Sequence, residues 1–512
     1  MSSRSRRPRP TSTERRPRAV VDGARPWTAA SNSLGVFLAA LGVVVFESPE
    51  VVASRPLTFI LLLGSVAVFL SKAIRWESLV ALLIGVIFFI PIKRYTLPAS
   101  LPFNLEPYRI LVAAIVAVWL VALLVDPRVQ LRRSGYDGPI VSFLLVALFS
   151  LVVNPGRLRQ PGVSVEAIKT LTFFLSFVLV FYFVVSVVRS QEVVDLVVKF
   201  MVGSGAVVAA FAVIENRTGY NIFDHLSILP LLTFHDPNLD VASLDRGGGV
   251  RVYASAQHPI ALAAVLVMLI PLGIYLARTR RPYVWSGATA VMALGAAATV
   301  LRTAILMLAI ELIVLLVVRP REGVRVLAAV PIALVLVLIV APGSVKGLYD
   351  AFAPQGGLIE QQTQIVAGSP NASPRLADLG PSLHQFARHP MLGIGFGTRV
   401  LPTDYILDDQ WLGSLLEIGL IGVLVLAWLF HRSLRRLSRV ARGDPSPRGA
   451  LCAAFAASVA AFGAGMLTFD AFSFIQVTYV FFVVLALGSA LINHPVASEP
   501  PASFESAGGQ MP

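Results

Sequence analysis

The sequence predicts an all-α membrane protein, a bundle of about twelve to fourteen helices that cross a lipid bilayer. Hydrophobic residues make up 56% of the 512 residues and charged residues only 14%, against about 45–50% and about 25% in soluble globular domains. The mean hydropathy of +0.76 excludes a soluble enzyme, a disordered chain and a fibrous protein. The single cysteine, Cys452, leaves no intramolecular disulfide and no multi-cysteine metal site.

Apolar stretches of a length suited to a bilayer recur along the chain. A transmembrane helix needs roughly twenty apolar residues to cross about 30 Å of hydrocarbon. Several stretches contain nearer fifteen, so the expected number of spans is twelve to fourteen. The fourteen stretches are 33–47, 57–71, 78–92, 109–125, 139–153, 168–188, 193–215, 260–277, 283–300, 303–318, 325–342, 411–430, 449–468 and 472–492.

The basic residues orient these spans. With a cytoplasmic N-terminus, 27 of the 42 Lys and Arg residues fall inside, and only eight lie in short outer segments. Both termini are therefore expected in the cytoplasm, and the net charge of +13 needs no nucleic-acid partner. The expected divisions are a disordered basic tail that can touch anionic lipids, three transmembrane groups, two extracytoplasmic loops and a second disordered tail: 1–30, 31–215, 216–259, 260–342, 343–410, 411–492 and 493–512.

Two outer loops are too long to be simple connections. Loops of the length of 216–259 and 343–410 usually carry function. The second is expected to contain an amphipathic helix from about Pro374 to Arg388 that lies on the outer membrane face. A Gly380-Pro381 pair in its middle predicts a kink or two shorter helices. Its apolar stripe consists of Leu376, Leu379, Leu383 and Phe386.

Arginines in the outer segments suit an anionic ligand. Arg251 precedes the eighth span, and Arg302 occupies the turn between the ninth and tenth. A guanidinium stays charged and can bind phosphate oxygens bidentately in a poorly hydrated site. The alternative is an arginine that merely marks the membrane boundary by reaching to the interface.

Carboxylates at the twelfth span suit acid–base chemistry. Asp408 and Asp409 directly precede that span, so either can cap the helix or act as a general base for a hydroxyl. Glu417 and Glu311 lie inside apolar spans, where ionisable groups usually have partners and roles; packing through a hydrogen bond is the alternative reading.

Two further patterns have ordinary explanations. The segment Gly393-x-Gly395-x-Gly397 has the wrong context and spacing for a nucleotide loop and is expected to let the chain turn tightly toward the membrane. His235, Asp236, Asp240 and Asp245 have no standard cation-ligand spacing, so no metal site is predicted.

The segment Arg388–Gly422 resembles the signature of the O-antigen ligase and O-antigen polymerase family of bacterial polytopic membrane proteins. It contains HPxxGxGxG from His389, a polar pair entering a helix, and L-x-E-x-G-x-x-G from Leu415. The segment from Arg251 to His258-Pro259 and the turn around Arg302 resemble the two loop arginines of that family. The likeness covers roughly residues 245–430.

The resemblance implies a membrane glycosyltransferase at the outer face of the bacterial cytoplasmic membrane. It implies metal-independent, inverting polymerisation or ligation of a surface glycan, without a cofactor. The implied donor is a glycan on undecaprenyl or decaprenyl diphosphate, the acceptor is a glycan or glycolipid, and other envelope-polysaccharide proteins are possible partners. Carried over, diphosphate binding falls on Arg251, Arg302 and Arg388, catalysis on Asp408 and Asp409, and support on His389, Gln410, Glu417, Tyr253 and His258.

One departure and two rival functions remain open. Ligases of the family carry His-Asn where this chain has Asp408-Asp409, which favours a polymerase, or a ligase with another acceptor, and leaves Asp404 and His389 as alternative bases. A transporter or flippase of a lipid-linked oligosaccharide also suits fourteen spans, but such folds tend to show internal repeats and helices broken at the midplane. A non-catalytic scaffold for envelope synthesis is the third reading.

Overall fold

The computed structural model describes most of the predicted membrane region. The described residues are 76–97, 106–125, 129–228, 232–234, 245–246, 249–340, 349, 375–400, 404 and 407–493. The predicted spans 33–47 and 57–71, both tails, and residues 235–244 with most of the suspected cation cluster lie outside them.

The described residues form an all-α polytopic membrane protein, as predicted. Each of the twelve predicted spans within the described ranges is a helix, and eight helices are long and apolar enough to cross a membrane: α5, α8, α9, α11, α14, α18, α19 and α20. The twelve helices are α4 (Trp76–Phe89), α5 (Pro107–Val125), α6 (Asp137–Val153), α8 (Val163–Val187), α9 (Gln191–Thr218), α11 (Pro259–Thr279), α12 (Pro282–Ala298), α13 (Arg302–Val318), α14 (Pro320–Val340), α18 (Gln410–Gly443), α19 (Pro447–Gly465) and α20 (Ile475–Asn493).

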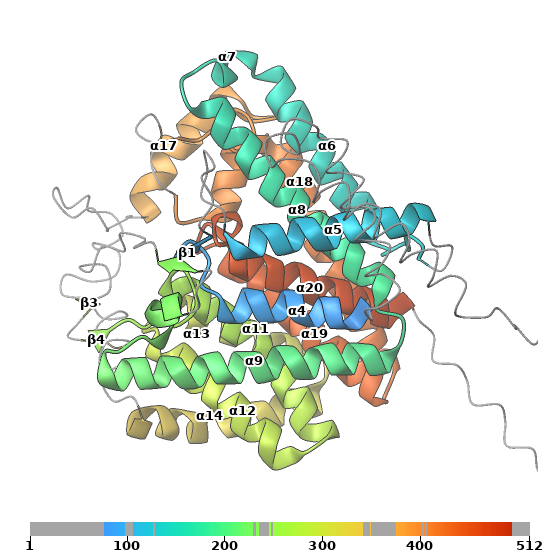
Figure 1. Ribbon diagram of the computed structural model, residues 1–512, viewed down its shortest axis with the longest axis vertical. Coiled ribbons are helices and arrows are strands. Elements are labelled where there is room, and N and C mark those ends of the chain that lie inside the picture. The colour runs from blue at the N-terminus through green and yellow to red at the C-terminus, as the bar shows by residue number, and fades with distance from the viewer. Residues whose placement is uncertain are drawn as a thin grey trace, which may run out of the picture.

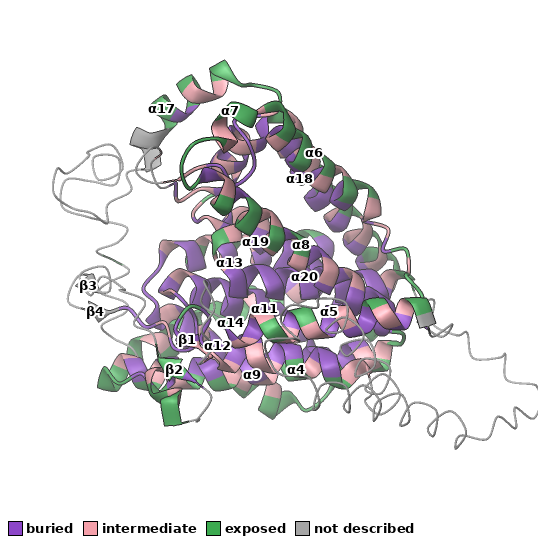
Figure 2. Cartoon of the chain, turned by 45° about the horizontal axis from the view of Figure 1, so that its top comes forward, coloured by how far each residue is buried: buried purple, intermediate pink, exposed green. Residues whose placement is uncertain are grey.

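Three helices form the centre of the bundle. The apolar windows of α20, α11 and α19 are 94%, 83% and 78% buried, whereas α14 is only 6% buried and lies at the periphery (Figure 1). Figure 2 shows the buried residues gathered along the middle of the bundle. Small residues let the helices approach closely: the Ser458 hydroxyl of α19 donates to the Met268 carbonyl of α11 at 2.7 Å.

The shorter elements lie mostly at one end of the bundle. Strand β1 (Tyr95–Thr96), after α4, pairs antiparallel with β2 (Thr233–Phe234), so the α4–α5 loop is joined to the first long loop. The other short elements are α7 (Pro155–Leu158), η1 (Ile222–Ile228), β3 (Asp245–Arg246), β4 (Gly249–Val250), α17 (Arg375–Arg388) and η2 (Ala471–Ser473).

Helix α17 confirms the predicted amphipathic helix but not its interruption. It runs as one helix through Pro381, so the alternative of two shorter helices is wrong. Its expected first residue, Pro374, lies outside the described residues. Phe386 packs against a small cluster of Leu407, Leu412 and Leu416, while Leu383 stays exposed. Contact with α18 therefore holds the last turn of its apolar stripe.

Arginines tie the helices together at the opposite end. The Arg319 guanidinium donates to the Ala441 carbonyl at 2.9 Å, near the end of α18, and Arg448 donates to the Leu491 carbonyl at 3.2 Å, near the end of α20. Cations in these positions satisfy the free carbonyls of helix C-termini. Helix α18 itself continues to Gly443, well beyond its predicted span, because its last turns are amphipathic and basic. We call this end of the bundle the basic end. The opposite end holds most of the short elements and a cavity lined by charged residues, and we call it the cavity end.

Candidate functional site

A break in α18 and the glycine-rich loop fit together at the cavity end. Gly419 has φ 66° and ψ −169°, so the regular helix stops there and starts again. The loop meets the carbonyls freed by the break: the N–H of Ile394 donates to Leu416 at 2.9 Å, and that of Gly395 donates to Glu417 at 3.0 Å. Irregular backbone at membrane depth is tolerated when protein groups satisfy it in this way. The two segments that carry the family resemblance are thus one structural unit.

Only glycine fits on either side of this contact. A Cβ on Gly393 would lie 2.4 Å from the Leu416 carbonyl oxygen, and one on Gly419 would lie 2.3 Å from that of Met391. The backbone is left-handed at both, a conformation that glycine adopts without steric cost. The prediction that these loop glycines turn the chain tightly is confirmed by positive φ angles at Gly393, Gly395 and Gly397.

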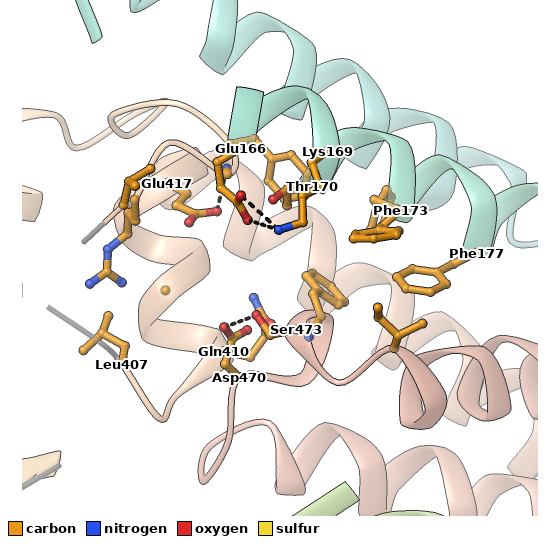
Figure 3. A pocket seen from close by; sticks show the side chains of 18 of the residues that line it. Glu166, Lys169, Thr170, Phe173, Phe177, Leu407, Gln410, Glu417, Asp470 and Ser473 are labelled. Atoms are coloured by element: carbon orange, nitrogen blue, oxygen red, sulfur yellow. Dashed lines mark hydrogen bonds and ion pairs between the residues drawn. The ribbon is translucent and has the colours of Figure 1, made fainter. Parts of the chain in front are cut away.

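This unit forms one wall of a cavity of about 770 Å³ (Figure 3). The other walls come from the α4–α5 loop, α5, α8 and the turn between α19 and α20. The volume lies within the range of about 300–1,000 Å³ of small-molecule sites. Phenylalanines of α8, of the glycine-rich loop and of the α19–α20 turn line part of it. Its charged lining residues are Lys93, Arg109, Lys169, Arg399, Glu106, Glu166, Asp404, Asp409, Glu417 and Asp470.

Two carboxylates face this space from opposite segments of the chain. The Glu417 carboxylate accepts a hydrogen bond from the Gly397 N–H at 3.0 Å, and Asp470, in the α19–α20 turn, accepts one from the Ser473 hydroxyl at 2.6 Å (Figure 3). Burial raises the pKa of Asp470; the Ser473 hydrogen bonds oppose this shift, and the nearby charge of Asp408 adds to it. A carboxylate with a raised pKa is a stronger base.

The start of α18 is fixed by the predicted polar residues. Asp409 is the N-cap, accepting from the Leu412 N–H at 3.0 Å, which confirms the capping reading for that residue. Buried Gln410 accepts from the Phe472 N–H at 2.8 Å and so joins α18 to the α19–α20 turn. Both line the cavity. Asp408 is half-buried and is not among the described residues that line it.

Basic side chains face the cavity from the N-terminal half of the chain. The Arg109 guanidinium donates to buried Glu106 at 2.6 Å, and the Lys169 ammonium lies 3.0 Å from a Glu166 oxygen. One face of α8 lines the cavity, polar in its first turns and aromatic in the next. Its residues recur at helical spacing: Glu166, Lys169, Thr170, Phe173, Phe174 and Phe177.

The predicted segment Arg251–His258 lies behind the cavity wall rather than in it. The Gln257 amide donates to the Ser473 carbonyl at 3.1 Å, and the His258 ring lies 5.6 Å from that of Phe474. Arg251 is 6% exposed. His258 is the N-cap of α11, and its Nδ1 accepts a hydrogen bond from the Ile260 N–H. Burial and then the charge of Arg251 lower the pKa of His258 to about 4, so the imidazole is neutral at physiological pH.

Buried Arg94 holds this segment in place. Its guanidinium pairs with Asp224 at 2.5 Å, donates to the carbonyls of Ala254 and Ala256, and lies 4.7 Å from the Tyr253 ring centre. The Tyr253 hydroxyl donates to the other Asp224 oxygen at 3.2 Å. The predicted supporting residue Tyr253 thus belongs to a network that joins the α4–α5 loop to two distant parts of the α9–α11 loop.

Arg302 begins α13 after a strained turn. The preceding Val300 is buried and has φ 53°, a left-handed conformation that is a genuine outlier for a β-branched residue. Such strain persists where the surrounding structure demands it, often at functional sites. The turn therefore fixes the backbone position from which the Arg302 side chain extends. Arg302 is not among the described residues that line the cavity.

The other predicted residues lie on the surface or deep in the bundle. Arg388, at the end of α17, lies 3.1 Å from the Nε2 of His384, and both Arg388 and His389 are exposed outside the cavity lining. Glu311 is buried in α13. The structure therefore brings Asp409, Gln410 and Glu417 to the cavity, whereas Arg251, Arg302, Arg388 and His389 stay outside its lining.

Sequence reasoning missed the residues of the cavity that lie outside the family motif. Lys93, Arg109 and Lys169 are among the few basic residues in short outer segments, where the positive-inside rule disfavours them. Their presence on the side that the rule disfavours could have marked these three residues as candidates. Asp470 is a lone carboxylate in a short apolar turn and offered a similar but weaker signal.

Comparison with known proteins gives one positive result. Residues 287–427, little more than a quarter of the chain, match the family described as O-Antigen ligase. The matched segment contains Arg302, the glycine loop and the break in α18. No curated protein matches the chain.

Proposed function

We propose, from the match of residues 287–427 to the O-antigen ligase family, that the protein transfers a glycan from a polyprenyl diphosphate to a sugar hydroxyl. The family supports glycan ligation or polymerisation in general. The lipid-linked donor, undecaprenyl or decaprenyl diphosphate, is the finer part of the proposal. We place the reaction at the outer face of the bacterial cytoplasmic membrane, with both termini inside.

The observation that carries this proposal is the cavity beside the broken α18. It lies at the end of the bundle where the glycine loop and the break meet, and it combines carboxylates, basic side chains and aromatic rings. Sugar transfer from a diphosphate needs a base near the acceptor hydroxyl and positive charge near the leaving group. This mixture suits both requirements.

The proposed reaction is a single inverting displacement. The acceptor oxygen forms a bond to the anomeric carbon while the bond from that carbon to the diphosphate oxygen breaks. A carboxylate takes the hydroxyl proton, and polyprenyl diphosphate leaves with the electron pair. Because diphosphate is already a good leaving group, the protein mainly orients the acceptor and stabilises developing negative charge.

We assign roles to residues on chemical grounds. Asp408 remains our sequence-based candidate for the base, and Asp409, Glu417 and Asp470 are the nearby carboxylates that line the cavity. Arg251, which lies behind the cavity wall, and Arg302, at the start of α13, are proposed to bind the diphosphate. Exposed Arg388 is proposed to meet the donor as it approaches.

A flippase of lipid-linked oligosaccharides is the rival that one observation favours. Transporters often contain broken helices, and α18 is broken at Gly419. The break lies nine residues after the helix start at Gln410, and a loop of the same chain fills it, so it builds a wall rather than a midplane site.

Reconstitution separates the two functions. Purified protein in lipid vesicles would be given a polyprenyl-diphosphate-linked glycan and a soluble sugar acceptor. The proposal predicts a longer glycan and an equal amount of free polyprenyl diphosphate. Movement of intact lipid-linked glycan across the bilayer without cleavage would establish the flippase instead.

A further inference from the structure

Lys93 brings an unpaired positive charge into the cavity. It follows α4 and lines the cavity together with Arg109 and Lys169. Arg109 pairs with Glu106, and Lys169 pairs with Glu166. Glu106 also accepts a hydrogen bond from Lys93, but from the backbone N–H of the lysine, at 2.6 Å, and not from its ammonium. Within the described part of the chain, no hydrogen bond or ion pair reaches the Lys93 ammonium.

The backbone at Lys93 is held in an unfavourable conformation. Its φ of 68° is left-handed, a conformation that is sterically unfavourable for a residue with a Cβ. Two interactions hold this turn. The backbone N–H of Lys93 donates a short hydrogen bond to Glu106, and the buried guanidinium of the next residue, Arg94, pairs with Asp224. A glycine would satisfy the turn without strain, so the fold alone does not explain a lysine here.

The Lys93 side chain is exposed to solvent, so its ammonium is accessible to a ligand that enters the cavity. Partial desolvation lowers the pKa of Lys93, and the charge of Lys169 lowers it further, against the raising effects of Glu106, Asp470 and Glu166. Two lysines and an arginine thus line the cavity together with these three carboxylates. A bound anionic group would offset the repulsion between the two lysines.

We propose that the Lys93 ammonium binds an anionic oxygen group, a phosphate or a carboxylate, of the glycan substrate. The inference rests on the proposed function and adds a contact from the N-terminal half of the chain, separate from Arg251 and Arg302. The group can belong to the donor diphosphate or to an acidic sugar of the acceptor. In both cases the ammonium donates charge-assisted hydrogen bonds to its oxygens.

Ligand-dependent thermal unfolding tests the contact without any turnover. Full-length protein in nanodiscs would be heated with inorganic pyrophosphate and, separately, with glucuronate. We expect one probe to raise the unfolding temperature of the wild type and of Lys199→Gln, a matched change in α9 near the basic end, but not that of Lys93→Gln. Dependence on pyrophosphate identifies the donor phosphate, and dependence on glucuronate an acidic acceptor.

A glycine variant excludes a merely structural role. Without ligand, Lys93→Gly should unfold at the wild-type temperature or above it, because glycine accepts a φ of 68°. It should nevertheless lose the ligand-induced shift. The inference is overturned if neither probe stabilises the wild type, or if the Lys93 variants keep the full shift.

Transfer kinetics separate this inference from the proposed function. Losing a charge-assisted hydrogen bond predicts a rise of roughly ten- to hundredfold in the KM for the substrate that carries the anion. Unchanged kinetics in both Lys93 variants would refute the contact while leaving glycan transfer intact. If the wild type transfers no glycan but its stabilisation by pyrophosphate depends on Lys93, the anion site stands and the proposed function fails.

Discussion

At the scale of single residues, Arg251 and Arg302 are tested by replacement with lysine. Lysine keeps the charge but loses the planar fork that binds phosphate oxygens bidentately. Losing a contact that strengthens in the transition state predicts a loss of about 3 kcal/mol, or about a hundredfold in kcat/KM. An arginine that only marks the membrane boundary would tolerate lysine. Near-wild-type kcat/KM in both variants, at equal amounts of folded protein, would remove these two residues from the site.

Asp470 predicts opposite effects on activity and stability. Its folded-state pKa is raised, so the ionised carboxylate destabilises the folded protein at pH values above its folded pKa, and this cost disappears below the unfolded pKa. Asp470→Asn should therefore melt at the wild-type temperature or higher at neutral pH, with the gap shrinking as the medium is acidified. If Asp470 serves the reaction, the same variant loses turnover. A lower melting temperature at neutral pH, with the gap unchanged by acid, would contradict this reading.

At the scale of elements, the joint between the glycine loop and α18 predicts which glycines are indispensable. Gly393→Ala and Gly419→Ala each place a Cβ within 2.4 Å of a backbone atom at a positive φ. The backbone conformation alone costs roughly 1–2 kcal/mol, and the clash adds to it. Thermal unfolding should show both variants clearly destabilised.

Gly203 of α9 provides the control. A Cβ there meets nothing within 4 Å, and alanine in a helix interior is favoured over glycine by roughly 0.5–1 kcal/mol. Gly203→Ala should therefore be neutral or stabilising. Equal melting temperatures for Gly419→Ala and Gly203→Ala would mean that the break in α18 is not held by this contact.

Hydropathy predicted the elements because a bilayer imposes length and composition on each span. All twelve predicted spans within the described residues are helices, but their ends moved. Helix α18 extends beyond its apolar span because basic, amphipathic turns continue the helix past the bilayer. The break at Gly419 and the unbroken passage through Pro381 depend on what packs against each residue, which local sequence patterns do not contain.

At the scale of the whole molecule, the orientation in the membrane is open to direct labelling. The native Cys452 is buried, so single cysteines added at exposed positions report alone. Ser227 of η1, near the cavity end, and Arg439 of α18, at the basic end, are both exposed. In intact cells, a membrane-impermeant thiol reagent should label Ser227→Cys and spare Arg439→Cys. The reverse pattern would invert the proposed topology.

The site was only partly predictable because it is assembled from distant segments. Asp409, Gln410 and Glu417 were found since they lie together in one motif. Lys93 and Asp470 are hundreds of residues apart, and only the packing of the helices brings both to one cavity. Residues in the wall behind a site, such as Arg251, share a motif without lining the space itself.

The most direct test of the account is glycan transfer by Glu417→Gln. Glu417 joins the glycine loop to the broken helix and lines the cavity, and losing an acid–base group or its orientation lowers rates by roughly 10²–10⁴-fold. Glu192→Gln, an exposed position of α9 near the basic end, is the matched control. Release of polyprenyl diphosphate by reconstituted protein should proceed at the wild-type rate in Glu192→Gln and fall at least about a hundredfold in Glu417→Gln. Wild-type release by Glu417→Gln would contradict the placement of the reaction in this cavity.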